Sequence, residues 1–289
     1  MIVRNLGTVA NTRPISISEF GILSRAAEVI TDSSDDWTGG FTYDTIDGSI
    51  TSSNHVIMGS ATDEDIEVVP NESEPAFRFY YPFEVRTTIE VSTMGTTPAK
   101  VLERATNAIN VVIQKNIESE FWTGALAEQL TPENRSLSQT DVDNLTPSAS
   151  TTVGVRAKHA LAILERALGD ATVGSKGVIH ATRDVASVLD CSNQDGALVT
   201  KLGNYVVAGS GYTGSGPAEA VPPAGMAWMY ATGPVTVRIG SLNVRPDSVQ
   251  QAVNSSNNTI NYFVDRPAAV TWSTSKLYAV LVDLSLDLA

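Results

Sequence analysis

The side chains whose spacing most closely matches a known binding motif lie in a glycine-rich stretch. Gly209, Gly211 and Gly214 match the G-x-G-x-x-G pattern of dinucleotide-binding loops, and they follow a predicted strand. Such a loop must lead into a helix whose N-terminus faces the pyrophosphate, but Pro217 begins a proline-rich run that ends at Pro223. A proline also stands where a phosphate-binding loop requires lysine. We therefore interpret this stretch as a flexible surface loop.

The other reactive side chains support neither metal binding nor nucleophilic catalysis. The three histidines, His55, His159 and His180, lie far apart, and none has a second ligand at a useful spacing. The acidic cluster at 63–67 lacks the glycine and the distal glutamate of a calcium loop. No G-x-S-x-G motif occurs, and no pair of carboxylates suggests an acid and a base. We predict that the chain is not an enzyme and has no catalytic residue, no metal and no cofactor.

Composition favours a protein whose surface is covered by neighbours. The 289 residues can bury a sizeable core, in one large domain or two. The formal net charge of −13 argues against direct recognition of DNA, which usually requires a basic face. Only 18% of the residues are charged, below the roughly 25% of ordinary soluble domains, and this fits a subunit buried among other copies.

The single cysteine and the hydropathy pattern bear on the cellular compartment. One cysteine, Cys191, forbids an intrachain disulfide, so we expect folding in a reducing compartment or without crosslinks. Asp190 and Asp195 lie nearby and should raise the pKa of this thiol, which argues against a catalytic role. The first ten residues do not form a signal-peptide pattern, and no apolar run approaches 18 residues. We therefore expect no membrane contact.

A strict alternation over residues 77–91 predicts one very long strand with a single buried face. At about 3.3 Å per residue it would span roughly 50 Å, whereas an average strand has five or six residues. A strand of that length overreaches a compact domain, so we predict that another molecule buries part of its apolar face. That face carries Phe77, Phe79, Tyr81, Phe83, Val85, Thr87, Ile89 and Val91.

The segment before this strand is acidic and extended. Residues 32–76 contain no lysine or arginine, and Asp63, Glu64, Asp65 and Glu67 form a cluster within them. Short alternating pieces and the two prolines at 70 and 75 indicate a turn that leads into the long strand. We predict an extended two-stranded hairpin, which must lie against something else because isolated hairpins are marginal in water.

A long helix follows over 98–123. Thr97 is its predicted N-cap, Pro98 occupies the first helical position, and Gly124 ends it. At 1.5 Å per residue this helix is about 38 Å long, more than twice the mean for globular proteins. The predicted stripe consists of Leu102, Ala105, Ile109, Val112, Asn116 and Phe121, and Val101, Ala108 and Ile117 widen it.

The remaining sequence alternates between short helices and strands, so the predicted fold class is α+β. We predict helices over 18–30, over 155–168 with Gly169 as its stop, and over 183–189. The predicted strands cover 178–181, 204–208, 226–230, 235–239, 260–264, 269–272 and 277–284.

This order of elements resembles the major capsid proteins of tailed bacteriophages, whose shell fold encapsulins share. The string TPAKVLERATNAINVVIQKNIESEFWTG, at 97–124, is similar to their spine helix and its exit. The strings VRAKHALAILERAL, GVIHATR and DVASVL are similar to a helix, a strand and a helix of their second domain. The strings AWMYATGPVTVRIG and INYFVDRPAAVTWSTSKLYAVLV look like the return into the peripheral domain.

The resemblance implies a domain order and a function. It implies an N-terminal arm (1–40), an extended loop (41–95), a peripheral domain with the spine helix (96–152), an axial domain (153–232) and a return to the peripheral domain (233–289). Such a chain would self-assemble as hexamers and pentamers into an icosahedral shell around packaged double-stranded DNA, without sequence-specific binding. Its location would be the virion capsid, assembled in the host cytoplasm, with a portal protein, a separate scaffolding protein and a decoration protein as candidate partners.

Two features depart from patterns found in the family. Some members crosslink an extended-loop lysine to a neighbour's asparagine, but this chain has no lysine from Met1 to Thr97. Some members also carry a long N-terminal scaffolding segment, whereas this chain reaches its predicted extended loop at residue 41. We therefore expect no such crosslink in this loop and a separate scaffolding protein.

The resemblance also assigns contacts between subunits. We hypothesise that the acidic tip of the extended loop meets Arg238, Arg245 and Arg266 of an adjacent peripheral domain, because the acidic segment lacks any cation of its own. Gly209, Gly211, Tyr212 and Gly214 would form a loop at the capsomer centre. The predicted contact residues of the extended loop are Asp63, Glu64, Asp65, Glu67, Phe77, Arg78, Phe79, Tyr81, Phe83, Glu84 and Arg86.

Three alternatives stay open from sequence. An encapsulin-like cellular nanocompartment would use the same fold around a cargo protein. A nucleotide-dependent enzyme would use the Gly209 to Gly214 loop. A β-rich tail or decoration protein is disfavoured by the long helix.

Overall fold

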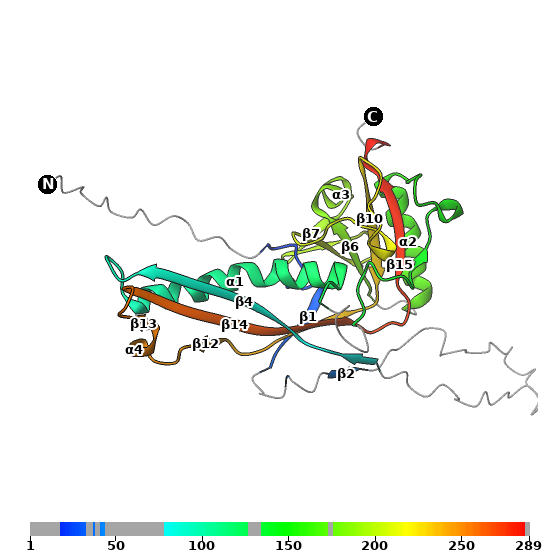
Figure 1. Ribbon diagram of the computed structural model, residues 1–289. Coiled ribbons are helices and arrows are strands. Elements are labelled where there is room, and N and C mark those ends of the chain that lie inside the picture. Colours follow the sequence, from blue (N-terminus) through cyan, green and yellow to red (C-terminus); the bar gives the residue numbers. More distant parts are fainter. Residues whose placement is uncertain are drawn as a thin grey trace, which may run out of the picture.

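The structure is a computed structural model that describes residues 18–32, 37, 41–43, 78–126, 134–172 and 176–286. These residues form a six-stranded sheet, a seven-stranded sheet and a two-stranded ladder. An elongated part contains the long helix and the first sheet, and a second part contains the other sheet with its helices (Figure 1). The predicted acidic tip, with Asp63, Glu64, Asp65 and Glu67, lies outside the described residues, as do Phe77 and the side chains of Arg78 and Phe79.

The long helix, α1 (Pro98–Thr123), is confirmed at both ends. The Thr97 hydroxyl accepts a hydrogen bond from the Lys100 backbone N–H, and Gly124 adopts the left-handed conformation with φ of 68°. The buried stripe is rotated from the predicted one, since Leu102 is half-buried and the Val112 side chain is exposed. The buried side chains of this helix include Val101, Ala105, Ile109, Ile113, Ile117 and Phe121.

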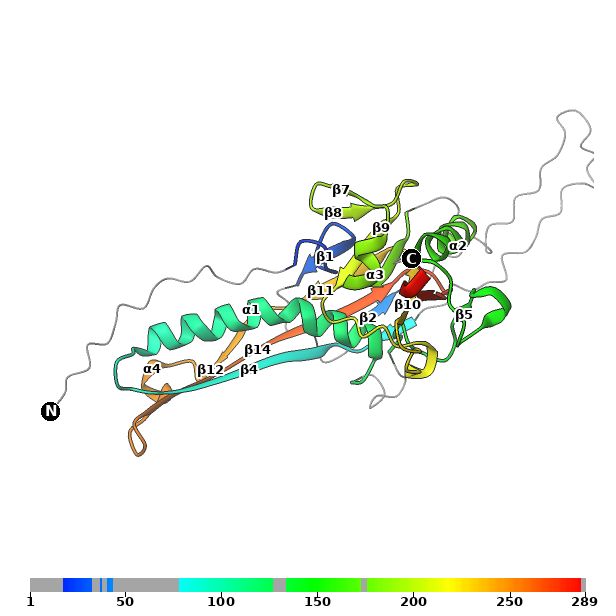
Figure 2. The same ribbon diagram turned by 90° about the horizontal axis from the view of Figure 1, so that it is seen from above.

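The predicted long strand is divided in two at Tyr81 and Pro82. Strand β3 (Arg78–Tyr80) pairs with β2 (Phe41–Tyr43) in a short antiparallel ladder. This ladder brings together the residues that flank segment 44–77. Strand β4 (Phe83–Ser92) instead pairs with β14 (Thr259–Trp272), from Phe83 opposite Ala268 to Ser92 opposite Thr259. Helix α1 lies along both strands, as both views show (Figures 1 and 2). The chain's own helix thus covers part of the apolar face of β4, because Phe83 and Val85 are buried while Thr87, Ile89 and Val91 are half-buried. Burial of the remaining part by another molecule stays a prediction.

The first sheet continues beyond β14. Strand β11 (Val235–Ile239) pairs with β14, and β1 (Ala27–Thr31) adds to β11 in parallel. Strands β12 (Asn243–Arg245) and β13 (Val253–Asn254) also pair with β14, with the short helix α4 (Val249–Ala252) between them. The predicted helix over 18–30 was wrong: turns lead into β1, and the arm supplies a strand of the body.

The second sheet has the strand order β5-β15-β10-β6-β9-β8-β7. The strands are β5 (Asp143–Asn144), β6 (Val178–Thr182), β7 (Ser192–Gln194), β8 (Ala197–Val199), β9 (Tyr205–Gly209), β10 (Met226–Thr232) and β15 (Tyr278–Asp283). Helices α2 (Ala157–Ala171) and α3 (Arg183–Val188) pack against it, and single 3-10 turns occupy Pro147–Ala149, Pro217–Glu219 and Leu284–Leu286. One prediction is corrected here, because α2 continues past Gly169 to Ala171. Strand β15 pairs with β10 in this sheet.

The C-terminal end of α1 joins the two sheets. Phe121 meets Trp272 of the first sheet edge-on with ring centroids 5.5 Å apart, and Trp122 meets Tyr230 of the second at 5.0 Å. These buried side chains belong to one apolar cluster that runs through α1 and both sheets. A separate cluster lies between the second sheet and helices α2 and α3. The two parts therefore share one core.

Candidate intersubunit surface

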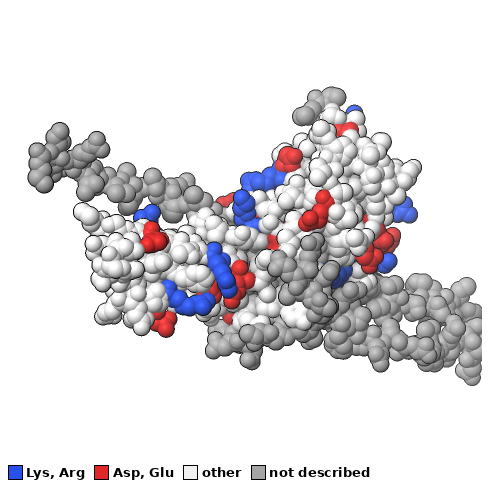
Figure 3. Space-filling view, viewed as in Figure 1, with Lys and Arg blue, Asp and Glu red and all other residues white. Residues whose placement is uncertain are grey.

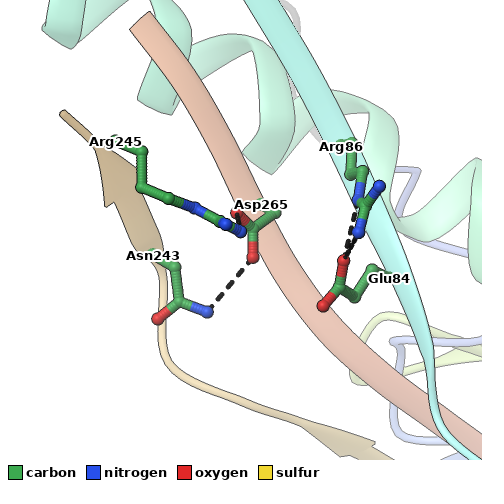
Figure 4. Close-up of polar contacts among 5 residues, drawn as sticks. All are labelled: Glu84, Arg86, Asn243, Arg245 and Asp265. Atoms are coloured by element: carbon green, nitrogen blue, oxygen red, sulfur yellow. Dashed lines mark hydrogen bonds and ion pairs between the residues drawn. The ribbon is translucent and has the colours of Figure 1, made fainter.

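The outward face of β4, β14 and β12 carries a row of charged and amide side chains. The register places Arg86 opposite Asp265 and Asp265 opposite Asn243, so three neighbouring strands contribute one side chain each. Asp265 is fully buried and accepts hydrogen bonds from Arg245 at 2.7 Å and from the Asn243 amide at 3.2 Å (Figure 4). The Asp265 carboxylate raises the pKa of Arg245, mainly through this hydrogen bond. Sequence reasoning missed Asp265 and Asn243, because only pairing across strands brings them to Arg245.

Within this row, Arg86 also donates to Glu84, two residues earlier on the same strand (Figure 4). The guanidinium groups of Arg86 and Arg245 both lie near the Phe263 ring, at 5.7 Å and 5.1 Å from its centroid. In the view of Figure 3, acidic and basic side chains lie next to each other over strands β4 and β14, whose places Figure 1 shows. Most of the surface in this view is uncharged. The predicted contact residues Glu84 and Arg86 are exposed, as an intersubunit surface requires.

Arg238 lies on the outward face of β11, over a shallow groove. Its guanidinium is 3.7 Å from the Asp32 carboxylate and stands over the Phe41 ring, 4.8 Å from the centroid. The groove has a volume of about 270 Å³ and is lined by side chains that include Ile30, Phe41 and Tyr80. Arg238 is therefore engaged within its own chain.

Arg266 is also held by its own chain. Its Nε donates to the Gly240 carbonyl at 2.8 Å, and its Nη1 donates to the Asn110 side chain of α1 at 3.4 Å. Partial burial lowers the pKa of this guanidinium. The three predicted partners of the acidic tip thus have different surroundings and do not form one patch. Their contact with the tip stays a prediction.

The remaining loop-base residues are partly covered. Phe83 is buried, and Tyr81 is half-buried with its backbone N–H and carbonyl both hydrogen-bonded to the Asn134 side chain at 2.8 Å. Asn134 and the next residues therefore anchor the point where β3 ends and β4 begins. These contacts fix the base of the predicted extended loop on the body of the protein.

The glycine-rich stretch does not form the flexible surface loop predicted for it. Gly209, Gly211, Tyr212 and Gly214 are all buried. The Glu118 carboxylate of α1 accepts hydrogen bonds from the Gly211 N–H at 2.9 Å and from the Ser210 hydroxyl at 3.1 Å. The loop is therefore fixed on the long helix, and its predicted place at the capsomer centre stays a prediction.

Glu118 also binds the N-terminal segment, and sequence reasoning did not identify it. Its carboxylate accepts from the Ile22 N–H at 3.0 Å and from the Gln114 side chain at 2.8 Å. Glu118 lies opposite the apolar stripe of the helix, so helical periodicity alone assigns it to solvent. Only a partner distant in sequence could reveal that it is fully buried.

The environments of Cys191 and His180 are those of structural residues. Burial and then the neighbouring Asp190 raise the pKa of the Cys191 thiol. His180 is fully buried, with Nδ1 2.9 Å from the Tyr212 hydroxyl and Nε2 2.9 Å from the Thr232 hydroxyl. Within the described ranges, no group of three or more His, Cys, Asp and Glu side chains is arranged to hold a metal ion. None of the helices described there has the length and apolar character needed to cross a membrane.

Comparison with known proteins gives matches in structure only. No protein-family profile and no curated protein sequence matches the chain. A chain from the capsid of an empty GTA particle matches with a TM-score of 0.53 at 12% identity, over 95% of this chain and 94% of the other. A chain of Mycobacterium phage Adephagia matches with a TM-score of 0.51 at 11% identity, over 94% and 91%.

The native GTA particle provides a third match, with a TM-score of 0.51 at 12% identity, over 94% of this chain and 99% of that one. These matches extend over nearly all of each chain, so they concern the whole architecture rather than one sheet. At such low identity they establish the fold and nothing finer. This chain has the α+β fold of phage major capsid proteins.

Proposed function

We propose that this chain is a major capsid subunit that self-assembles, as hexamers and pentamers, into an icosahedral shell around double-stranded DNA. The observation that carries the proposal is the end-to-end likeness to a chain of the empty GTA capsid, over 95% and 94% of the two chains. A domain insertion or a shared sheet would give only a partial match.

The surface is consistent with a structural subunit. Only 18% of the residues are charged, and the charges of Figure 3 lie in small mixed groups. Apolar area buried between copies would supply stability at roughly 25 cal/mol per Å², repeated over many interfaces. The proposal gives the chain no catalytic role, and it places the protein in the virion capsid after assembly in the host cytoplasm.

The proposed partners follow from this role. The chain would contact many copies of itself, a portal protein and a separate scaffolding protein, with a decoration protein as a further candidate. The net charge of −13 suits a wall that encloses DNA and does not hold it tightly. The packaged DNA would be enclosed without sequence-specific contacts.

Electron microscopy of the purified full chain tests the proposal. We expect hollow shells or capsomer rings, and nuclease-resistant double-stranded DNA in particles isolated from an infected host. Shells that hold a protein cargo and no nucleic acid would favour the nanocompartment alternative. A compact monomer at high concentration, with or without the scaffolding protein, would overturn both.

A thermal-shift screen with NAD, FAD and ATP tests the enzyme alternative. We expect no stabilisation, because Glu118 already occupies the N–H of Gly211 in the glycine-rich loop. A clear upward shift with one nucleotide would contradict this expectation.

A further inference from the structure

We propose that two copies of this chain pair symmetrically through the free edge of β4, the edge that faces away from β14. The two strands would run antiparallel about a two-fold axis at Thr88, so that Arg86 of each copy lies opposite Glu90 of the other. The inference rests on the proposed function and specifies one interface of the shell.

Strand β4 has a long edge without a paired strand in the described part of the chain. Its ten residues, Phe83–Ser92, pair with β14 on one side, and none of the described strands pairs with the other side. Figure 2 shows β4 at the margin of the sheet, beside β14. In an antiparallel ladder about half of the N–H and C=O groups of an edge strand point away from its partner. These groups are available to another strand.

The edge lacks the features that usually prevent pairing between sheets. The register of β4 with β14 runs through ten consecutive pairs without a bulge, and β4 contains no proline and no lysine. The strands on the far side of the sheet are shorter, with five residues in β1 and three in β12. A regular edge of ten residues is the one most suited to bind a further strand.

The charged side chains of β4 are complementary to a second copy of the same strand. Arg86, Thr88 and Glu90 share the outward face and are exposed. A two-fold axis at Thr88 sets each Arg86 opposite Glu90 of the other copy, because both lie two residues from the axis. Opposite charges that face each other across two antiparallel strands stabilise the pair. Symmetry provides two such contacts in every interface.

Neighbouring registers lose these contacts. A shift by two residues in one direction sets Glu84 opposite Glu90 of the other copy, which brings like charges together. The same shift in the other direction sets Arg86 opposite Ser92, so neither charge pair forms. A shift by one residue sets outward side chains opposite inward ones, which a shared pleat does not allow. The sequence of β4 thus selects one register.

The helix side of β4 fits the same register. The half-buried Val91 would lie opposite Val85 of the other copy, and the half-buried Ile89 would lie opposite Thr87. A groove of about 260 Å³ lies between β4 and the C-terminal end of α1, and its lining includes Val85 and the exposed Leu126. The Val91 side chain of the other copy would reach this groove. Pairing would therefore bury apolar area that a single chain leaves half-exposed.

Cysteine crosslinking tests the symmetric register. On the axis, residue 88 meets its own copy, and opposite residues of antiparallel strands have Cα atoms about 4.5 to 5.5 Å apart, within the range that a disulfide spans. We expect Thr88→Cys, in a Cys191→Ser background, to form a covalent dimer on mild oxidation. Ser92→Cys in the same background is the matched control, because its two copies would lie about 26 Å apart.

A mixed experiment checks the register away from the axis. Glu84→Cys and Ser92→Cys should each stay uncrosslinked alone and form a covalent dimer when mixed, since residue 84 lies opposite residue 92 of the other copy. No dimer from Thr88→Cys, or as much dimer from Ser92→Cys alone, would overturn the proposal.

Charge reversal tests the contact of Arg86 with Glu90. Arg86→Glu sets two carboxylates opposite each other, and Glu90→Arg sets two guanidinium groups opposite each other. We expect each variant alone to lower the dimer fraction in sedimentation about tenfold, because two positions change in every symmetric pair. An equimolar mixture should restore dimers, since unlike charges then meet between the two variants.

The matched controls reverse charges on another element. Arg166→Glu and Asp170→Arg change exposed side chains that are also four residues apart, on α2, and should leave the dimer fraction unchanged. Dimer fractions of Arg86→Glu and Glu90→Arg equal to that of the wild type would overturn the contact.

These measurements separate the inference from the proposed function, because they use the dilute full chain before shells form. If the wild type forms no shells but the crosslinks and the charge reversals follow the expected pattern, the proposed function fails and the contact stands. If shells form while Thr88→Cys gives no covalent dimer within them, the contact is wrong and the proposed function stands. Pairing of β4 with a different strand of a neighbour would give this second result.

Discussion

His180 shows how one buried side chain couples stability to pH. Its ring is fully buried between the Tyr212 and Thr232 hydroxyls, and burial lowers its pKa from the usual 6.5 to about 3. The unfolded chain therefore binds a proton at His180 below pH 6.5, whereas the folded chain binds this proton only below about pH 3. Stability must fall with decreasing pH across this window.

We predict that His180→Gln removes this part of the pH dependence. The wild type should lose about 4 to 5 kcal/mol more than the variant between pH 7 and pH 3, at 1.36 kcal/mol per pKa unit. Urea denaturation at several pH values measures the difference, and His159→Gln is the control because His159 is exposed. Parallel stability curves for the wild type and His180→Gln would contradict the prediction.

The Glu118 carboxylate joins two segments distant in sequence, the N-terminal segment and the glycine-rich loop, to helix α1. The Ile22 N–H, the Ser210 hydroxyl and the Gly211 N–H all donate to it, together with the Gln114 side chain. We predict that Glu118→Ala destabilises the protein by about 3 to 5 kcal/mol, because it leaves several buried donors without an acceptor. Glu103→Ala, at an exposed position of the same helix, should change the free energy of unfolding by under about 0.5 kcal/mol. Similar denaturation midpoints for the two variants would count against this role.

At the scale of elements, the glycine-rich loop fits α1 only because it lacks side chains at the contact. A Cβ added at Gly211 would lie 2.2 Å from the Lys115 carbonyl oxygen and 2.7 Å from the Ser119 nitrogen. We predict that Gly211→Ala costs about 2 kcal/mol or more, since backbone atoms on both sides must shift. Gly169→Ala in α2 is the control, and it should stabilise by about 0.5 to 1 kcal/mol because its Cβ would meet nothing within 4 Å. Thermal unfolding of both variants checks the opposite signs.

The elements differ in how far sequence alone could predict them. Helix α1 is predicted to the residue because its signals are local: Thr97 caps it, Pro98 begins it and Gly124 ends it. Strand β14 is predicted only in two pieces around Pro267, although it runs unbroken opposite Glu84 on β4. The helix predicted over 18–30 fails because Gly21 presses against Gln114 of α1, a contact that no local pattern contains.

The candidate surface follows the same division between local and distant contacts. The sequence predicted Glu84 and Arg245 as contact residues between subunits, and both side chains are exposed, while the contacts themselves stay a prediction. It could not place Asp265, which the register of three strands brings to Arg245, nor the buried partners of Glu118. Contacts between elements far apart in sequence are therefore the part that needed the structure.

For the whole molecule, helix α1 has several structural roles, and a different part of the helix serves each of them. Its inner face packs on β4 and β14, its C-terminal end carries Trp122 and Phe121 into the shared core, and its outward face leaves three cations exposed. The helix can therefore expose charge on one face without exposing the core that holds the two sheets together.

The response of assembly to salt distinguishes charge from apolar burial at this scale. Salt weakens contacts between exposed charges, because the Debye length falls from about 10 Å at 0.1 M to about 3 Å at 1 M, whereas it does not weaken apolar burial. We predict that wild-type assembly falls between 0.1 M and 1 M sodium chloride. A neutral variant with Lys100→Gln, Arg104→Gln and Lys115→Gln should assemble less at 0.1 M and show a flatter salt dependence. Light scattering across the series measures both slopes, and equal slopes would mean that charges other than Lys100, Arg104 and Lys115 cause the salt sensitivity.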